Sequence, residues 1–258
     1  MTGNNEVYLL LNGQKPLWLP AVDFRESDLV GGDLRGAWMT SGRFDRAFLS
    51  DAILTGANLV SCSFLDANLE SAQLSYANLR RAVFQRAILN RANLRDAILV
   101  EADLTQANLT GADLFRTALH DAVFDRAILT GARLSTSAGP RVRFSGADLT
   151  SADLDSMRAP QSDFTSAQLR SAVLRAADLS GSNLEGADLR GAILAHAVLN
   201  NVRLVHANLE NGDLRNARLL GADLTGATLT GAQYNDGTLW PTGFDPDAAG
   251  AVADPILP

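Results

Sequence analysis

The chain has 258 residues and a formal net charge of −7, and Lys15 is the one lysine among its 22 basic residues. This balance argues against direct binding to nucleic acid or to an anionic membrane, because both require a basic surface. No apolar run is long enough for a membrane span, the start lacks a secretory signal pattern, and the single Cys62 excludes an internal disulfide. We therefore expect a cytoplasmic protein.

Residues 1–21 differ from the rest of the chain and are predicted to form an N-terminal cap. Pro16 and Pro20 prevent regular structure towards the end of this segment. Its large apolar residues are expected to cover the open end of the core that follows; they are Leu9, Leu10, Leu11 and Trp18. The alternative is a segment that docks onto another molecule.

From Phe24 to Tyr234 a large apolar residue recurs at every fifth position without a slip, and Ala most often lies two places before it, as around Leu94 and Leu99. On an α-helix five residues advance about 140° beyond a full turn, so these residues would form no stripe. In a straight strand an odd period sends alternate residues to opposite faces. Residues 22–235 therefore predict a chain that turns a corner every five residues and winds into a solenoid.

The spacing of phenylalanine gives the number of sides. Seven of the ten Phe lie 20 residues apart or a multiple of it, at positions 24, 44, 64, 84, 124, 144 and 164. Pro140 and Pro160 repeat the same spacing. Four pentapeptides therefore make one coil, which predicts an all-β solenoid, a four-sided parallel β-helix of about ten to eleven coils with short caps.

The repeats resemble those of the pentapeptide repeat family, as in Ala147-Asp148-Leu149-Thr150-Ser151 and Ala222-Asp223-Leu224-Thr225-Gly226. The resemblance covers residues 22–235 and implies a right-handed quadrilateral β-helix. It also implies a binding protein, because members of known role bind other macromolecules. They include the quinolone-resistance type, which resembles DNA and engages gyrase.

A longer period suggests where a partner would bind. A 40-residue repeat places Arg46, Arg86 and Arg126 in one outer row and Phe48, Ile88 and Ile128 in the next. Arginine and large apolar side chains are enriched at the centres of interfaces, so this corner is the candidate partner-binding site. The competing interpretation is a solvated charge ladder, because Asp66 lies between Arg46 and Arg86.

Gly139-Pro140 and Ala159-Pro160 interrupt the pattern, because the central position there loses its large side chain. Val142 and Met157 are unusually large for the small-residue position and are expected to refill the lost volume. The alternative is a shallow pocket on that side.

Residues 236–258 are predicted to be a C-terminal lid with a mobile tail over the last dozen residues. The segment from Tyr234 to Pro246 resembles the closing segment of many cyanobacterial pentapeptide repeat proteins, with Trp240 and Phe244 folding back over the column end. A covered end predicts a monomer, with an end-to-end dimer as the alternative.

Catalytic and metal-binding groups are not expected to converge. His120, His196 and His206 fall on three different sides when positions are counted in coils of 20, and no phosphate-binding glycine motif is present. No cofactor or metal is predicted, and Cys62 is expected to be a packed thiol. The sequence thus predicts a non-enzymatic scaffold that binds a protein, with neither nucleic acid nor membrane as partner. The alternative is a DNA mimic that protects gyrase, although each side mixes both signs of charge.

Overall fold

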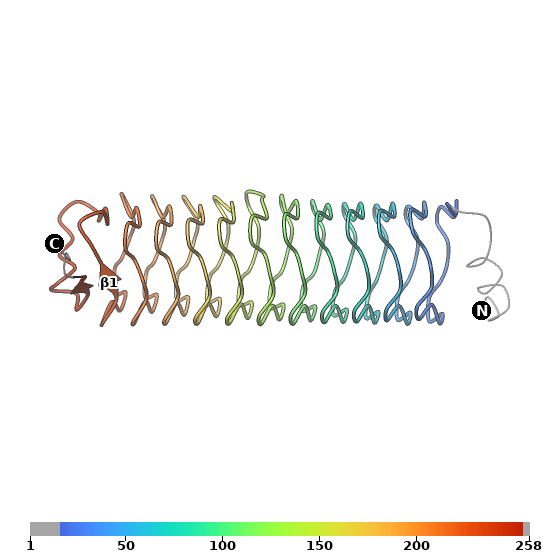
Figure 1. Cartoon of the computed structure of the whole chain (residues 1–258), viewed down its shortest axis with the longest axis horizontal. Coiled ribbons are helices and arrows are strands. Elements are labelled where there is room, and N and C mark those ends of the chain that lie inside the picture. Colours follow the sequence, from blue (N-terminus) through green and yellow to red (C-terminus); the bar gives the residue numbers. More distant parts are fainter. Residues whose placement is uncertain (1–15, 255–258) are drawn as a thin grey trace.

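The computed structural model of the protein describes residues 16–254, so the expected role of Leu9, Leu10 and Leu11 lies outside the described residues. Figure 1 shows a straight column of stacked coils whose colours follow the sequence from one end to the other. Each coil therefore packs against the coils immediately before and after it.

The coils pair in parallel with a period of 20 residues. The residue before each central apolar residue bridges its counterpart one coil later, as in Phe48↔Asn68 and Ile53↔Gln73. On each side of a coil one residue, between two corners, forms a bridge to the next coil. A strand needs at least two consecutive paired residues, so residues 16–254 contain two strands, β1 (Gln233–Tyr234) and β2 (Val252–Ala253), which pair in parallel. The predicted four-sided parallel β-helix is confirmed.

The core is a continuous column of small and large apolar side chains. Leu99 and the alanine at Ala97 are among the fully buried residues of one cluster that runs the length of the coils. Phenylalanines stack along one side with ring centroids 4.8 Å apart for Phe44 and Phe64, and 4.7 Å apart for Phe64 and Phe84. Burial of this column is the main stabilising contribution, since it scales with apolar area removed from water.

The corners are four-residue turns closed by a backbone hydrogen bond. In one of them the Ala52 amide donates to the Leu49 carbonyl at 3.0 Å, and Asp51 has a φ of +57°. A positive φ at the third residue is what a type II turn requires. Glycine fills this position in many coils, so the left-handed corner explains the fifth residue of the repeat.

The Gly139 and Ala159 coils keep their register and fill their interior. A Cβ on Gly139 would lie 2.3 Å from the His120 amide nitrogen, so the backbone of the preceding coil occupies the space that a side chain would need. Val142 and Met157 are fully buried, as expected for residues that refill the core. The packing therefore indicates a repaired interior at this place.

The two prolines change the hydrogen bonding of their turns. The Val142 amide donates to Ser162 Oγ at 2.9 Å, and the Ser162 amide donates to Ser182 Oγ at 3.0 Å. These buried hydroxyls replace the usual turn carbonyl as acceptors. Buried donors are thereby satisfied, which matters because an unpaired one costs about 1–3 kcal/mol.

The N-terminal end differs from expectation. Trp18 does not cover the end of the core: its side chain is 68% exposed and stacks outside the column on Trp38, with centroids 5.0 Å apart. The reason is register, because Trp18 bridges Trp38 and so occupies an outward position of the first coil. Leu17, one residue earlier, joins the buried core instead.

At the C-terminal end Trp240 and Phe244 pack against the core and stack on each other at 5.2 Å. β2 lies beyond them and pairs with β1, so the chain differs from the expected mobile tail at Val252–Ala253. Ala251 is buried in the core cluster, which gives this segment an apolar anchor that the sequence pattern did not reveal.

Candidate functional site

The three apolar residues of the predicted corner share one outer row. Successive bridges join Phe48 to Asn68, Ile88, Asn108 and Ile128, so large apolar side chains alternate with amides one coil apart. Phe48 is 53% exposed, Ile88 40% and Ile128 42%. The row therefore presents apolar groups to solvent at every second coil.

The three arginines lie in the neighbouring row at left-handed corner positions, but they are not equivalent. Arg46 is hydrogen-bonded to Glu26, and Arg86 donates to both carboxylate oxygens of Asp66 at 2.7 and 2.8 Å. The Arg86 guanidinium holds the pKa of Asp66 below its usual value. Within the described residues Arg126 forms no ion pair.

The structure thus brings the six residues into two adjacent rows but leaves members of a row two coils apart. Exposed arginine–carboxylate pairs contribute about 0–1 kcal/mol, so the pairs of Arg46 and Arg86 stabilise the fold only slightly. The ion pairs leave the apolar row of Phe48, Ile88 and Ile128 exposed.

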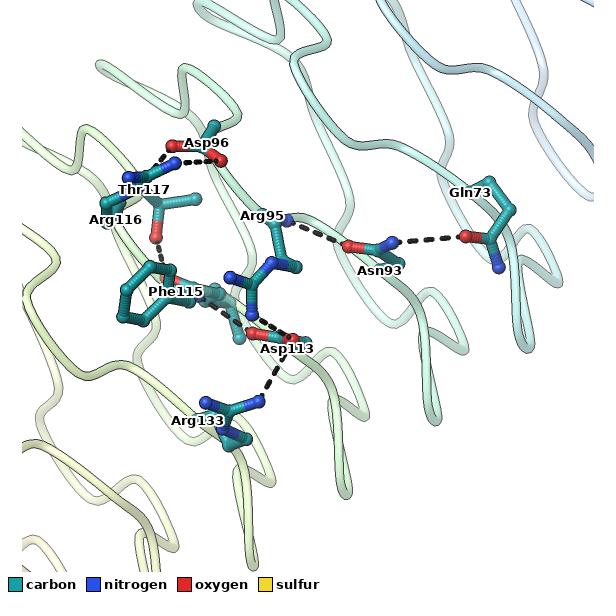
Figure 2. Close-up of polar contacts among 10 residues, drawn as sticks. Gln73, Asn93, Arg95, Asp96, Asp113, Phe115, Arg116, Thr117 and Arg133 are labelled. Atoms are coloured by element: carbon teal, nitrogen blue, oxygen red, sulfur yellow. Dashed lines mark hydrogen bonds and ion pairs between the residues drawn. The ribbon is translucent and has the colours of Figure 1, made fainter.

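A second cluster, which the repeat pattern did not reveal, surrounds Phe115 (Figure 2). Counted in coils of 20 residues, its corner lies diagonally opposite that of Arg46. The guanidinium carbon of Arg95 lies 4.4 Å from the ring centroid, that of Arg116 5.2 Å and that of Arg133 6.0 Å. Cations at such distances are attracted by the electron-rich face of the ring.

Two carboxylates hold these arginines in place. Asp113 accepts hydrogen bonds from Arg95 at 3.0 Å and from Arg133 at 3.4 Å. Asp96 accepts two from Arg116, at 2.7 and 2.9 Å, and the Arg116 guanidinium holds the pKa of Asp96 below its usual value. We call Arg95, Asp96, Asp113, Phe115, Arg116 and Arg133 the Phe115 patch.

A sequence signal for this patch existed. Phe115 is one of three phenylalanines outside the central register, and it occupies a corner position where most coils carry a polar residue. Arg95 lies 20 positions before it and therefore one coil below. Counting positions in coils would have brought the two together, although it would not have given the ring-to-guanidinium geometry.

Groups for metal or nucleophilic chemistry do not gather in the part of the chain that the structure describes. Residues 16–254 contain no cluster of three or more His, Cys, Asp or Glu side chains able to hold a metal ion. Cys62 is fully buried, and burial raises the pKa of its thiol to about 12. A protonated buried thiol is a poor nucleophile, in agreement with the packed role expected for it.

The surface hollows are shallow. One of about 210 Å³ is lined by Val60, Arg80, Arg81, Val100 and Glu101. Another, of about 340 Å³, lies near the C-terminal end and includes Arg175, His196 and Arg215. Arg215, which lines this second hollow, is already ion-paired with Asp213 and Asp254.

No helix in residues 16–254 has the length and apolar character to cross a membrane.

The family model of pentapeptide repeats matches eight stretches of the chain, at residues 19–56, 49–86, 62–99, 77–114, 87–131, 118–155, 167–204 and 203–233. Among curated proteins none matches.

Several solved structures are similar. HetL, a pentapeptide repeat protein involved in heterocyst differentiation regulation from Nostoc sp. strain PCC 7120, is 27% identical over 93% of this chain and 99% of its own, with a TM-score of 0.46. A pentapeptide repeat protein from Nostoc PCC 7120, alr5209, is 34% identical over 36% of this chain and 84% of its own, with a TM-score of 0.29.

QnrB1, a plasmid-mediated fluoroquinolone resistance protein, is 17% identical over 92% of each chain, with a TM-score of 0.35. These scores show how loosely the rods superimpose. The family model, which matches most of residues 19–233, is the stronger finding.

Proposed function

Because the chain belongs to the pentapeptide repeat family, with the right-handed four-sided β-helix of that family, we propose that it is a non-enzymatic scaffold that binds a protein partner. The partner contacts the outward rows of side chains. The interior is filled along its length by Ala, Leu and Phe, so recognition has to use the outer surface.

One observation carries this proposal: the row of Phe48, Ile88 and Ile128 is exposed on a rigid column. Large apolar side chains next to arginines are the residue types enriched at the centres of protein interfaces. A repeating backbone holds them in fixed positions, so little conformational entropy is lost on binding. Arg126, beside Ile128, adds to the same corner a guanidinium that forms no ion pair within residues 16–254.

DNA mimicry is not favoured by the surface charges. A mimic needs carboxylates that are free to imitate phosphates. Here Asp66 is paired with Arg86, and Glu101 with Arg81 at 2.7 Å, each one coil away. Such alternation cancels the sustained negative potential that a duplex presents.

The test is capture of a partner by the full-length tagged chain in extracts of the cells that produce it, followed by binding of the purified partner. We expect one protein to bind stoichiometrically, and Arg86→Ser with Ile88→Ser to weaken binding at least tenfold. The matched control is Arg190→Ser with Ile193→Ser, which removes the same residue types from outward positions elsewhere. Absence of any stoichiometric partner would refute the scaffold role.

A further inference from the structure

In the Phe115 patch, basic and acidic side chains do not simply alternate from coil to coil. Three guanidinium groups surround one ring while only two carboxylates, Asp96 and Asp113, hold them. Arg116 is 55% exposed and Arg133 52%, so most of their N–H donors face solvent. An arginine has five donors in a fixed fork, and the internal pairs use few of them.

The charge around the patch is locally positive on an acidic rod. The three stacked segments 91–96, 111–116 and 131–136 carry four arginines, because Arg91 adds to the three of the patch, and two aspartates. The whole chain has a net charge of −7. A positive area within a negative surface attracts and orients an anionic group.

The patch is also bounded. On the next coil, segment 151–156 carries Asp153 and Asp155 and no basic residue. On the preceding coil lies Tyr76, which is 63% exposed and interacts with Asp96. A long polyanion such as a nucleic acid would extend over the aspartates and be repelled, whereas a short acidic segment would fit within three coils.

We propose that the Phe115 patch binds a short acidic segment of a protein partner. The carboxylates of that segment accept hydrogen bonds from Arg95, Arg116 and Arg133, and an apolar part of it packs on Phe115. Preorganised arginines and an aromatic residue at the centre of a contact are features of binding hot spots. This inference rests on the proposed scaffold function and names a site and a partner class for it.

The probe is a blocked hexaglutamate peptide at low ionic strength, followed by the ¹⁵N–¹H signals of the arginine Nε groups of the full chain. We expect shifts confined to Arg95, Arg116 and Arg133, with affinity falling at least fivefold in Arg95→Ser with Arg133→Ser. The matched control is Arg170→Ser with Arg190→Ser. These two arginines also share one carboxylate, Asp188, at 2.6 and 2.7 Å, and should change affinity less than twofold.

Equal losses of peptide affinity in the two double variants would show that the peptide is attracted to any exposed arginine, and would overturn the proposal. Absence of peptide binding would overturn it as well. Tighter binding of a single-stranded DNA oligonucleotide at the same arginines would overturn it in favour of a nucleic-acid site. If the peptide fails while a captured partner still depends on Arg86 and Ile88, the patch is refuted and the scaffold function stands. Unchanged melting temperatures of the variants verify that the fold is retained.

Discussion

At the scale of single residues, inward and outward positions alternate within each pentapeptide and differ sharply in what they tolerate. Leu99 is fully buried, whereas Gln106 is exposed at a corner. Leu99→Lys places an unpaired charge in the core and should lower the free energy of unfolding by about 3–5 kcal/mol. Gln106→Lys should change it by less than about 0.5 kcal/mol. Urea unfolding measures both, and equal midpoints would contradict the assigned register.

Gly139 offers a test of the close backbone contact. A Cβ there would meet three backbone atoms of Leu119 and His120 within 2.8 Å, and backbone cannot rotate away as a side chain can. Gly139→Ala should therefore destabilise the protein by about 1–3 kcal/mol, as overpacking does.

The matched control is Gly31→Ala, where a Cβ meets nothing within 4 Å although φ is +64°. Many corners of this chain carry non-glycine residues at such φ values, for example Arg86 at +57°. The control should be the milder substitution in thermal unfolding; the reverse order would mean that the Gly139 backbone is free to relax.

At the scale of structural elements, Arg215 forms an ion pair that holds the C-terminal segment, including β2, against the last full coil. Arg215 donates to both oxygens of Asp213, at 2.9 and 2.7 Å, and to Asp254 at 3.1 Å, which directly follows β2. The amide of Asp254 donates to the Tyr234 carbonyl of β1 at 2.7 Å. The Arg215–Asp254 ion pair and the strand pairing therefore hold the same segment, and the two hydrogen bonds to Asp213 orient Arg215 towards Asp254.

The attachment of the C-terminal segment should depend on pH, because Asp213 orients Arg215 only while its carboxylate is ionised. Arg215 holds the pKa of Asp213 below its ordinary value of 3.8. Its stabilising contribution is complete above the ordinary pKa and is lost as the pH falls through the lowered pKa of the folded state. We expect the amide of Val252 to lose hydrogen-exchange protection below pH 3.8, before the amide of Leu99 does.

Arg215→Ser should produce the same loss of Val252 protection already at neutral pH. Exchange rates corrected for their intrinsic pH dependence give the comparison. Protection of Val252 that stays constant from neutral to acid pH in the wild-type chain would exclude Asp213 as the group responsible.

At the scale of the whole molecule, the sequence predicted the architecture because the architecture repeats. A fixed 20-residue period determines which residues become neighbours, so the pairing of Phe48 with Asn68 followed from counting alone. The positions of residues that depart from the repeat are harder to predict. Trp18 looked like a cap residue, yet its register places it outside, and the anchoring of Ala251 depends on a pairing one coil beyond the last repeat.

The candidate sites were predicted only in part, for a related reason. The 20-residue period determines which outward residues share a row, but the ion pair that a long side chain forms depends on its rotamer. Arg86 reaches back one coil to Asp66, while Arg126 in the same row forms no ion pair among residues 16–254. The stacking of Arg95 on Phe115 likewise requires a particular side-chain conformation that residue types do not specify.

The distribution of charge over the rod leads to a prediction about gyrase. Asp121 is paired with Arg141 at 2.7 Å, one more case in which a carboxylate meets an arginine of the next coil. A surface of paired charges should not compete with DNA, so micromolar protein should leave the supercoiling activity of gyrase unchanged. Inhibition, or protection of gyrase from a quinolone, would restore the DNA-mimic interpretation.

The last prediction concerns assembly through the ends. Leu239 donates its amide to Ala217 and accepts from Leu219, and Val252 donates to Ala232. The segment after Asn235 thereby occupies backbone groups of the last full coil that would otherwise form an open strand edge. Open edges of this kind pair with other chains.

The full-length protein should therefore be a monomer, whereas truncation after Asn235 removes Trp240, Phe244 and β2 and should yield dimers or aggregates. Removal of residues 255–258 alone is the matched control, because it keeps Asp254 and the Arg215 ion pairs, and it should remain monomeric. Light scattering distinguishes these states. A full-length dimer joined at the C-terminal end would show that Trp240 and Phe244 form an interface and not a cover.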